Sequence, residues 1–214
     1  MKHHVITIRS IGQSVGAAGR CINSGKQFGL DIKMFDAVTP SDNPVDMAID
    51  LGINVEGFHE VYSRYDNCVA AFMSHFTLWS MCLEQNEEFT IFEHDAIIVN
   101  DIPEYLPYKE VCSLGKPSYG KWNDPKTFGV NPLTSKRYFP GAHAYRIRPT
   151  GAEKLINQAK ILAKPTDVYL HLDTFPLLQE YYPWPVEARD TFTTIQKTEG
   201  CLAKHNYNEA YKII

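Results

Sequence analysis

The chain has 214 residues, with 21 Lys and Arg against 25 Asp and Glu, which gives a formal net charge of −4. A mildly acidic chain lacks the bulk positive charge that binds nucleic acid or an anionic membrane surface, so we expect neither as a partner. The hydrophobic content of 44% is typical of a globular protein with a sizeable core. No apolar run approaches the roughly 18 residues that span a bilayer, so we expect no transmembrane segment.

The N-terminus and the cysteines favour a cytoplasmic location. The first residues read as the start of a strand, because no apolar core followed by a small-residue cleavage site is present. The five cysteines are odd in number and widely spaced, and they contain no Cys-x-x-Cys pair. This usage favours a reduced protein without a structural zinc site.

The first hundred residues predict a parallel βαβ opening followed by a long helix. Residues 5–8 are β-branched and predict a buried strand, residues 13–29 a helix, and residues 31–38 a second strand that ends in a loop. A strand, a helix and a strand within about 35 residues favour parallel pairing. Residues 66–86 carry apolar side chains at helical spacing, and residues 89–99 are strand-like on both sides of an acidic interruption.

The second half is irregular at first and then alternates strand and helix. Residues 107–140 are rich in Pro, Gly, Asn, Lys and Tyr, so we expect a long, partly ordered active-site region. Residues 142–147 predict a strand, residues 149–163 a helix with Pro near its first turn, and residues 165–182 a further helical stretch. The alternation indicates an α/β fold.

Two carboxylates follow the apolar strand at 89–92 directly. Glu93 and Asp95 are two positions apart, and on an extended chain such positions point to the same side. Like charges at a strand end repel each other unless a cation lies between them, and ligands bind at this edge of open α/β sheets. The pair therefore predicts a site for Mn²⁺ or Mg²⁺ that holds a diphosphate, although a solvated strand end has the same pattern.

Several short motifs follow one another along the chain. They are, in order, Val5-Ile6-Thr7-Ile8-Arg9, Phe35-Asp36-Ala37-Val38, the helix Ala70–Trp79 with Ser74-His75, Glu93-His94-Asp95, Gly141-Ala142-His143-Ala144-Tyr145, Pro165-Thr166-Asp167 and Thr193-Thr194-Ile195. In this order and spacing they resemble glycosyltransferase family 25, the lipooligosaccharide-biosynthesis and collagen-galactosyltransferase family. The chain departs from the family at His94, which replaces the middle acid of a triplet, and at residues 63–67, which replace a glycine-rich segment.

The resemblance implies an α/β fold with a single GT-A-like nucleotide-sugar-binding domain over residues 1–214 and a mixed, mainly parallel sheet flanked by helices. Residues 1–100 would form the nucleotide-sugar-binding half and residues 101–200 the acceptor-side half. The implied reaction moves a hexose, galactose or glucose, from a UDP-sugar to a hydroxyl of a glycan or protein acceptor. The resemblance also implies that a divalent cation assists the transfer and that the anomeric carbon is inverted.

The same resemblance implies metal and catalytic roles. Asp95 and Glu93 would hold the divalent cation, and Asp95 would be catalytic through the leaving UDP. An inverting transfer needs a base for the acceptor hydroxyl, and Asp167 is the first choice ahead of Asp173; its plainer role is a helix N-cap. His94 either coordinates the metal as neutral imidazole or turns toward its neighbours.

The candidate substrate-binding residues are Arg9, Ser74, His75, Glu93 and His143. The Arg9 guanidinium suits a phosphate or uracil contact, or else a surface salt bridge. Ser74 and His75 lie on the amphipathic helix, either near the donor or as satisfied polar groups at its edge. His143 and Tyr145 alternate on a strand, so both should point to one side, toward substrate or into the core.

Two other functions fit the sequence. A catalytically inactive nucleotide-sugar-binding or glycan-binding protein on the same fold would keep the strand pattern and lose the metal or the base. The altered acidic triplet is the feature on which that alternative rests. A metal-dependent hydrolase that uses Glu93-His94-Asp95 is the weaker alternative, because no further His or Asp motif with ligand spacing is present.

Overall fold

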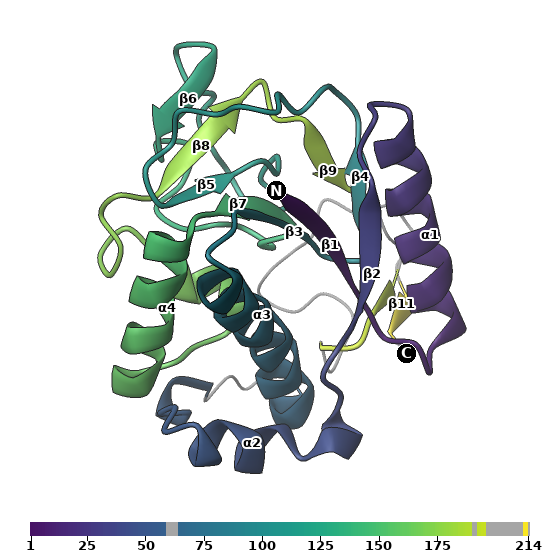
Figure 1. The fold of residues 1–214 in the computed structure, drawn as a ribbon, viewed down its shortest axis with the longest axis vertical. Helices are drawn as coiled ribbons and strands as arrows, with labels where there is room; N and C mark the ends of the chain where they lie inside the picture. Colours follow the sequence, from purple (N-terminus) through teal and green to yellow (C-terminus); the bar gives the residue numbers. More distant parts are fainter. Residues whose placement is uncertain (59–63, 190–191, 196–211, 214) are drawn as a thin grey trace.

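The computed structural model describes residues 1–58, 64–189, 192–195 and 212–213. Within them, helices pack against both faces of a central sheet (Figure 1). The helices are α1 (Gly12–Lys26), α2 (Pro44–Asp50), α3 (Tyr65–Gln85), α4 (Pro149–Ile161) and α5 (Thr166–Tyr169), with 3₁₀ turns η1 (Pro40–Asp42) and η2 (Glu56–Phe58).

The central sheet has the strand order β2-β1-β3-β7-β5-β8-β6. Its strands are β1 (Lys2–Thr7), β2 (Ile32–Asp36), β3 (Phe89–Phe92), β5 (Val111–Ser113), β6 (Gly129–Pro132), β7 (Ala144–Ile147) and β8 (Gln179–Tyr182). β7 and β6 run against their neighbours, and the other five strands share one direction. The predicted α/β fold with a mixed, mainly parallel sheet is therefore confirmed.

Two small sheets accompany the central one. β4 (Ala96–Ile98) pairs antiparallel with β9 (Val186–Ala188), and β10 (Phe192–Thr193) pairs parallel with β11 (Lys212–Ile213). β4 follows β3 after a turn at His94 and Asp95. Arg189, just after β9, donates its backbone N–H to the carbonyl oxygen of Asp95 at 2.9 Å. The small β4–β9 sheet thus braces the turn that follows β3.

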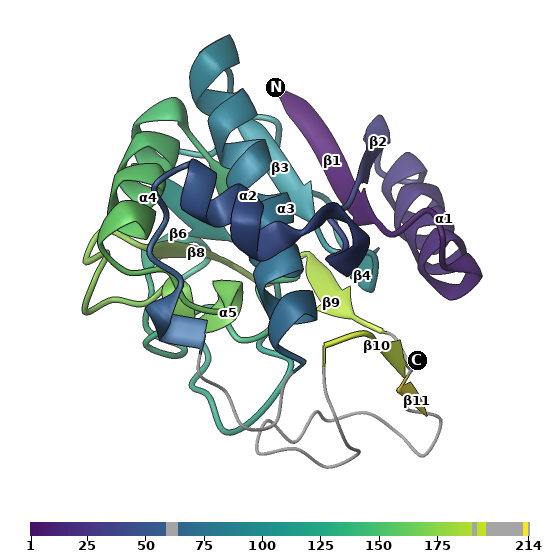
Figure 2. The same ribbon diagram turned by 90° about the horizontal axis from the view of Figure 1, so that it is seen from below.

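The central sheet separates two hydrophobic cores. α3 and α4 cover one face and α1 covers the other (Figure 2). Val5 and Ile6 are neighbours in β1 and belong to opposite cores, as the alternation of side chains along a strand requires. On the α3 side, Trp79 and Tyr145 are fully buried; on the α1 side, Cys21 is fully buried.

The sequence predicted most of the elements before residue 100 closely, but the structure differs from the prediction in three regions. The loop expected after the second strand contains η1 and leads into α2, which begins at Pro44. Residues 107–140, expected to be mostly irregular, contain β5 and β6, and residues 165–182 contain only the short α5 before β8. Strands of three or four residues have too little length to show a periodicity, and tertiary pairing decides their structure.

The described residues add two further observations. None of their helices is both long enough and apolar enough to cross a bilayer. Cys21, Cys68, Cys82 and Cys112 are buried thiols that form no disulfide with one another. Cys201 lies outside the described residues, as does the remainder of the segment from Gly200 to Tyr211.

Candidate functional site

A cavity of about 250 Å³ opens at the carboxyl ends of β1, β2 and β3, beside the N-terminal half of α3. This is the edge where ligands bind in open α/β sheets. Its walls come from the loops after β1 and β2, from α3, from the turn after β3 and from Thr194 and Ile195. The structure thereby brings together Ser74, His75 and Glu93, three of the residues singled out in the sequence.

Ser74 fixes one wall of the cavity. Its hydroxyl accepts the backbone N–H of Val38 at 2.9 Å and donates to the carbonyl oxygen of Ala70 one helical turn earlier, also at 2.9 Å. The side chain is fully buried. Both bonds serve the backbone, so Ser74 attaches the end of β2 to α3 at the edge of the cavity.

A chain of hydrogen bonds leads from the core to the carboxylate of Glu93. The Trp79 indole N–H donates to the hydroxyl of Tyr145 at 2.7 Å, and that hydroxyl lies 2.8 Å from Nδ1 of His75. Nε2 of His75 lies 3.1 Å from Oε1 of Glu93. We call these four residues the Trp79–Glu93 chain. Trp79, Tyr145 and His75 are at most 1% exposed, whereas the Glu93 side chain is 30% exposed and faces the cavity.

The Trp79–Glu93 chain has one direction when His75 carries its proton on Nε2. An indole N–H only donates, so the Tyr145 oxygen accepts from Trp79. In this tautomer Nδ1 of His75 accepts the Tyr145 hydroxyl, and Nε2 donates to Glu93 in its ionised form. Burial lowers the pKa of His75 to about 3, so the ring is neutral at pH 7. The chain therefore orients Glu93 without placing a positive charge beside it.

Asp167 lies close enough to act on the same group electrostatically. Burial raises the pKa of Glu93 above its usual range, and the negative charge of Asp167 raises it further. The Tyr119 hydroxyl donates to Oδ2 of Asp167 at 2.6 Å, and the Val168 N–H donates to its Oδ1 at 2.9 Å. Two carboxylates from distant parts of the chain thus interact electrostatically, and like charges that interact favour a shared proton or a bound cation.

The expectation that Glu93 and Asp95 point to the same side is wrong, because the backbone turns at His94 and Asp95 and is not extended there. Glu93 and His94 line the cavity, whereas Asp95 is not among its described lining residues. Burial raises the pKa of the Cys21 thiol in α1, and the charge of Asp95 raises it further. His94 is attached to α1 as well, since its Nδ1 lies 3.0 Å from Oγ of Ser14.

Arg9 and His143 lie outside the cavity wall. Arg9 is exposed at the end of β1 and forms an ion pair with Asp36, so the plainer of its two predicted roles describes this structure. The carbonyl oxygen of His143 accepts the backbone N–H of Glu93 at 2.9 Å. Its ring is 2% exposed and packs so closely on Gly115 that a β-carbon there would collide with it. Of the two positions expected for His143, the structure shows the buried one.

A metal site made by this chain alone is not present among the described residues, which contain no group of three His, Cys, Asp or Glu side chains able to hold a metal ion. Mg²⁺ usually needs only one or two carboxylates, because substrate phosphates supply further oxygens. Glu93, with Asp167 nearby, fits that smaller requirement. Asp95 is not among the described residues that line the cavity.

Sequence reasoning missed three contributors to the site, Tyr119, Tyr145 and Trp79. Trp79 lies four residues after His75, a spacing that places both on one face of α3 and could have linked them. Tyr145 was noted beside His143, but its hydrogen bond to α3 has no local signal. Tyr119 is 48 residues from Asp167, and only the tertiary fold joins them.

Comparisons with known proteins agree with part of this picture. The model of glycosyltransferase family 25 (LPS biosynthesis protein) matches residues 19–115, a segment with α3 and the Glu93–Asp95 turn but without Asp167 or His143. No curated protein sequence matches the chain. Among solved structures, it is similar to the inositol-1-phosphate CTP transferase from T. maritima, with 14% identity, a TM-score of 0.40 and 85% of each chain covered. Residues 19–115 thus carry the sequence pattern of glycosyltransferase family 25.

Proposed function

We propose that the chain transfers a hexose, galactose or glucose, from a UDP-sugar to a hydroxyl of a glycan or protein acceptor, with inversion at the anomeric carbon. In this proposal the chain acts as one GT-A-like unit. Residues 1–100 bind the donor, and residues 101–200 supply the acceptor side. The observation that carries the proposal is the cavity at the carboxyl ends of β1, β2 and β3. Its wall includes the carboxylate of Glu93, which His75 contacts and orients.

The donor half of the proposal rests on the shape and chemistry of this cavity. Apolar side chains such as Ile6 and Val38 line it together with hydroxyl groups of Thr39 and Ser41. A mostly apolar wall with a few polar groups is typical of a small-molecule site and suits a nucleoside. Arg9 lies next to the wall and would reach a diphosphate after release from Asp36.

The acceptor half rests on Asp167. An inverting transfer needs a group that takes the proton of the attacking hydroxyl. Asp167 is half-buried and is held on both of its oxygens, by Tyr119 and by the Val168 N–H. Its charge acts on Glu93 on the donor side, so the two carboxylates would lie on either side of the reacting centre.

A divalent cation, Mn²⁺ or Mg²⁺, belongs to the proposal as a shared ligand of protein and donor. Glu93 would hold it on the protein side, and Asp95 would join only after a change in the turn that carries it. When bound, the cation would neutralise the charge that develops on the leaving diphosphate.

The test is a thermal-shift panel of nucleotide-sugars with and without Mn²⁺, followed by turnover measurements with EDTA. A ligand of the native state raises the apparent melting temperature, so we expect one UDP-hexose to stabilise the chain and to be consumed when an acceptor is added. Binding without transfer or hydrolysis would identify the inactive binding protein. Release of free sugar at full rate without acceptor would identify the hydrolase.

A substitution in the cavity makes the panel specific. Ala71→Phe places a ring in the wall of the cavity, so we expect it to abolish the stabilisation by the nucleotide-sugar. Leu83→Phe introduces the same ring at an exposed position near the other end of α3 and serves as the matched control. Equal stabilisation of both variants by the donor would place the donor site elsewhere.

A further inference from the structure

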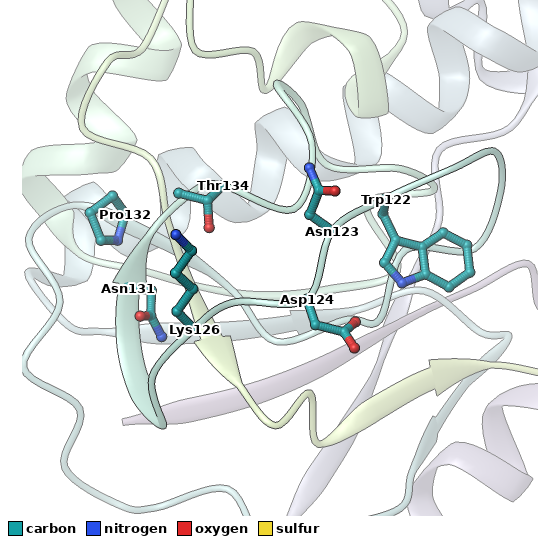
Figure 3. Close-up of a pocket in the computed structure, with 7 residues that line it drawn as sticks. All are labelled: Trp122, Asn123, Asp124, Lys126, Asn131, Pro132 and Thr134. Atoms are coloured by element: carbon teal, nitrogen blue, oxygen red, sulfur yellow. The ribbon is translucent and has the colours of Figure 1, made fainter.

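A second hollow, of about 900 Å³, lies beside β6 and shares no lining residue with the cavity described above. Figure 3 shows the indole ring of Trp122 at one end of it and side chains of β6 at the other. Its lining residues are Trp122, Asn123, Asp124, Lys126, Asn131, Pro132 and Thr134. We call it the Trp122 hollow. An indole ring with amide, carboxylate, ammonium and hydroxyl groups around it is a lining that can bind both faces and edges of a polar ligand.

The side chains on the Trp122 side of this hollow are available for a ligand, whereas those of Asn131 and Thr134 on the β6 side already form hydrogen bonds within the protein. Of the three tryptophans, Trp79 and Trp184 donate their indole N–H groups to Tyr145 and Glu180 inside the protein. The indole of Trp122 is half-buried, and it makes neither a ring contact nor a hydrogen bond with the described residues. The side chains of the neighbouring Asn123, Asp124 and Lys126 are exposed and likewise make no hydrogen bond or ion pair within the described part of the chain.

The opposite wall is held rigidly by buried polar groups. The carboxylate of Glu180 is fully buried and accepts the backbone N–H groups of Thr134 at 2.7 Å and Ser135 at 2.8 Å. It also accepts the indole N–H of Trp184 at 3.2 Å. A buried charge is costly unless it is hydrogen-bonded in this way. The wall is thus preorganised, which lowers the entropy lost on binding a ligand.

Charge and strand geometry narrow the class of ligand. Asp124 and Lys126 give the hollow one charge of each sign, so it offers no net attraction for a phosphate or a polyacid. β6 is an edge strand, but it ends in Pro132, which lacks the N–H needed to extend a β-ladder with a peptide. A neutral, polyhydroxylated molecule remains, since its C–H faces can stack on indole and its hydroxyls can bond to amide and charged groups.

A short segment of the chain links the hollow to the proposed acceptor side. Trp122 is three residues from Tyr119, whose hydroxyl contacts Asp167, and three residues of extended chain span at most about 10 Å. The segment is fixed along this distance, because Lys136 donates to the Tyr119 carbonyl at 2.7 Å and the Asn123 N–H donates to the Ser135 carbonyl at 3.2 Å. This short, fixed segment joins the contact with Asp167 to the edge of the hollow.

We propose that the Trp122 hollow binds a neutral saccharide unit of the acceptor, one that is remote from the hydroxyl that reacts. This inference rests on the proposed glycosyltransferase function and adds to it the place where part of the acceptor binds. It also decides between the two acceptor classes, because a saccharide subsite favours a glycan acceptor over a bare protein side chain. The acceptor would be recognised at two places, near Asp167 and at Trp122.

The test measures saccharide binding directly, without turnover. Lactose, maltose, cellobiose and N,N′-diacetylchitobiose are titrated at millimolar concentration and followed by saturation-transfer NMR and tryptophan fluorescence. We expect at least one to bind, Trp122→Ala to weaken it about tenfold or more, and Trp122→Phe to retain most of the affinity. Phe128→Ala is the matched control, because Phe128 is an aromatic residue of the same segment that is 82% exposed and outside the hollow.

The outcomes separate this inference from the proposed function. If no saccharide binds, or if Trp122→Ala binds as the native chain does, the subsite is refuted even when nucleotide-sugar stabilisation is found. If a saccharide binds through Trp122 while no nucleotide-sugar stabilises the chain, the hollow is a glycan site and the transferase proposal fails. Binding of a peptide or a phosphate through Trp122, with no saccharide bound, would also overturn the inference.

Discussion

Replacing Tyr145 with Phe removes one hydroxyl from the middle of the Trp79–Glu93 chain and leaves the ring in place. Two fully buried groups lose their partner, the indole N–H of Trp79 and Nδ1 of His75. Each unsatisfied buried group costs about 1–3 kcal/mol, so we expect the free energy of unfolding to fall by ~2–4 kcal/mol. For a chain of this size, that corresponds to a melting temperature lower by roughly 5–15 °C.

The same substitution should change the titration of Glu93. Without the Tyr145 hydroxyl, nothing at Nδ1 holds His75 in the tautomer that donates from Nε2, so the hydrogen bond to Glu93 weakens. That hydrogen bond favours the ionised carboxylate, so its weakening raises the pKa of Glu93 further above the usual range. We expect the acid limb of the pH profile of donor turnover to move to higher pH. Initial rates with a UDP-hexose between pH 5 and pH 9 measure this shift.

Tyr169→Phe is the matched control. Tyr169 is also buried in the core under α3, but its hydroxyl donates to the carbonyl oxygen of Leu155, which lies within α4. Removing this hydroxyl leaves no buried donor without a partner. We therefore expect the free energy of unfolding to fall by only about 1 kcal/mol and the pH profile to stay unchanged. If both variants lower the melting temperature equally and leave the profile unchanged, Tyr145 is an ordinary core residue and the Trp79–Glu93 chain does not orient Glu93.

Three further outcomes follow from the site. Glu93→Gln should reduce Mn²⁺-stimulated turnover more than Asp95→Asn, because Glu93 lines the cavity and Asp95 is not among its described lining residues; equal losses would contradict this. Asp167→Asn should lower kcat by about 10²-fold or more with donor affinity little changed, and a collapse of donor affinity would show that Asp167 is not the base. Burial lowers the pKa of His75 to about 3 and that of His143 to about 4, below the unfolded value of 6.5. The unfolded chain therefore binds protons first at these rings, which lowers the free energy of unfolding below pH 6.5 by up to ~1.4 kcal/mol per pH unit for each ring. Glu93, whose pKa is raised to about 8, has the opposite slope over the same range, so the comparison is made in Glu93→Gln. In that variant, urea titrations at pH 7 and pH 5 should show stability falling with pH, and a flat response would refute neutral burial of the rings.

The parts of the fold that the sequence predicted well are those with a strong local signal. α3 runs from Tyr65 to Gln85, close to the predicted 66–86, because apolar side chains that recur at helical spacing over 21 residues leave little ambiguity. β1 follows from a β-branched run, α1 and β2 from the segments that come after it, and the predicted parallel pairing of β1 with β2 is also correct. Such elements depend mainly on residues that are adjacent in sequence.

The missed elements depend on distant partners. β5 is a strand of three residues in the interior of the sheet, and its place there comes from pairing with β7 and β8. β8 lies in a segment that was expected to be helical, yet it pairs with β5 and β6. A short strand takes its stability from the strands on either side, which a single sequence does not reveal.

The acid-x-acid pattern shows which features of a site can be predicted from sequence spacing and which depend on local geometry. The spacing placed Glu93 and Asp95 correctly at the carboxyl edge of β3, since that depends only on where an apolar strand ends. The direction of each carboxylate depends on the turn at 94–95, which is held by the Arg189 N–H on Asp95 and by Ser14 on His94. Glu93 and His94 line the cavity, whereas Asp95 is not among its described lining residues. The carboxylate whose charge acts on Glu93 is that of Asp167 from the second half of the chain, an interaction that depends on the tertiary fold.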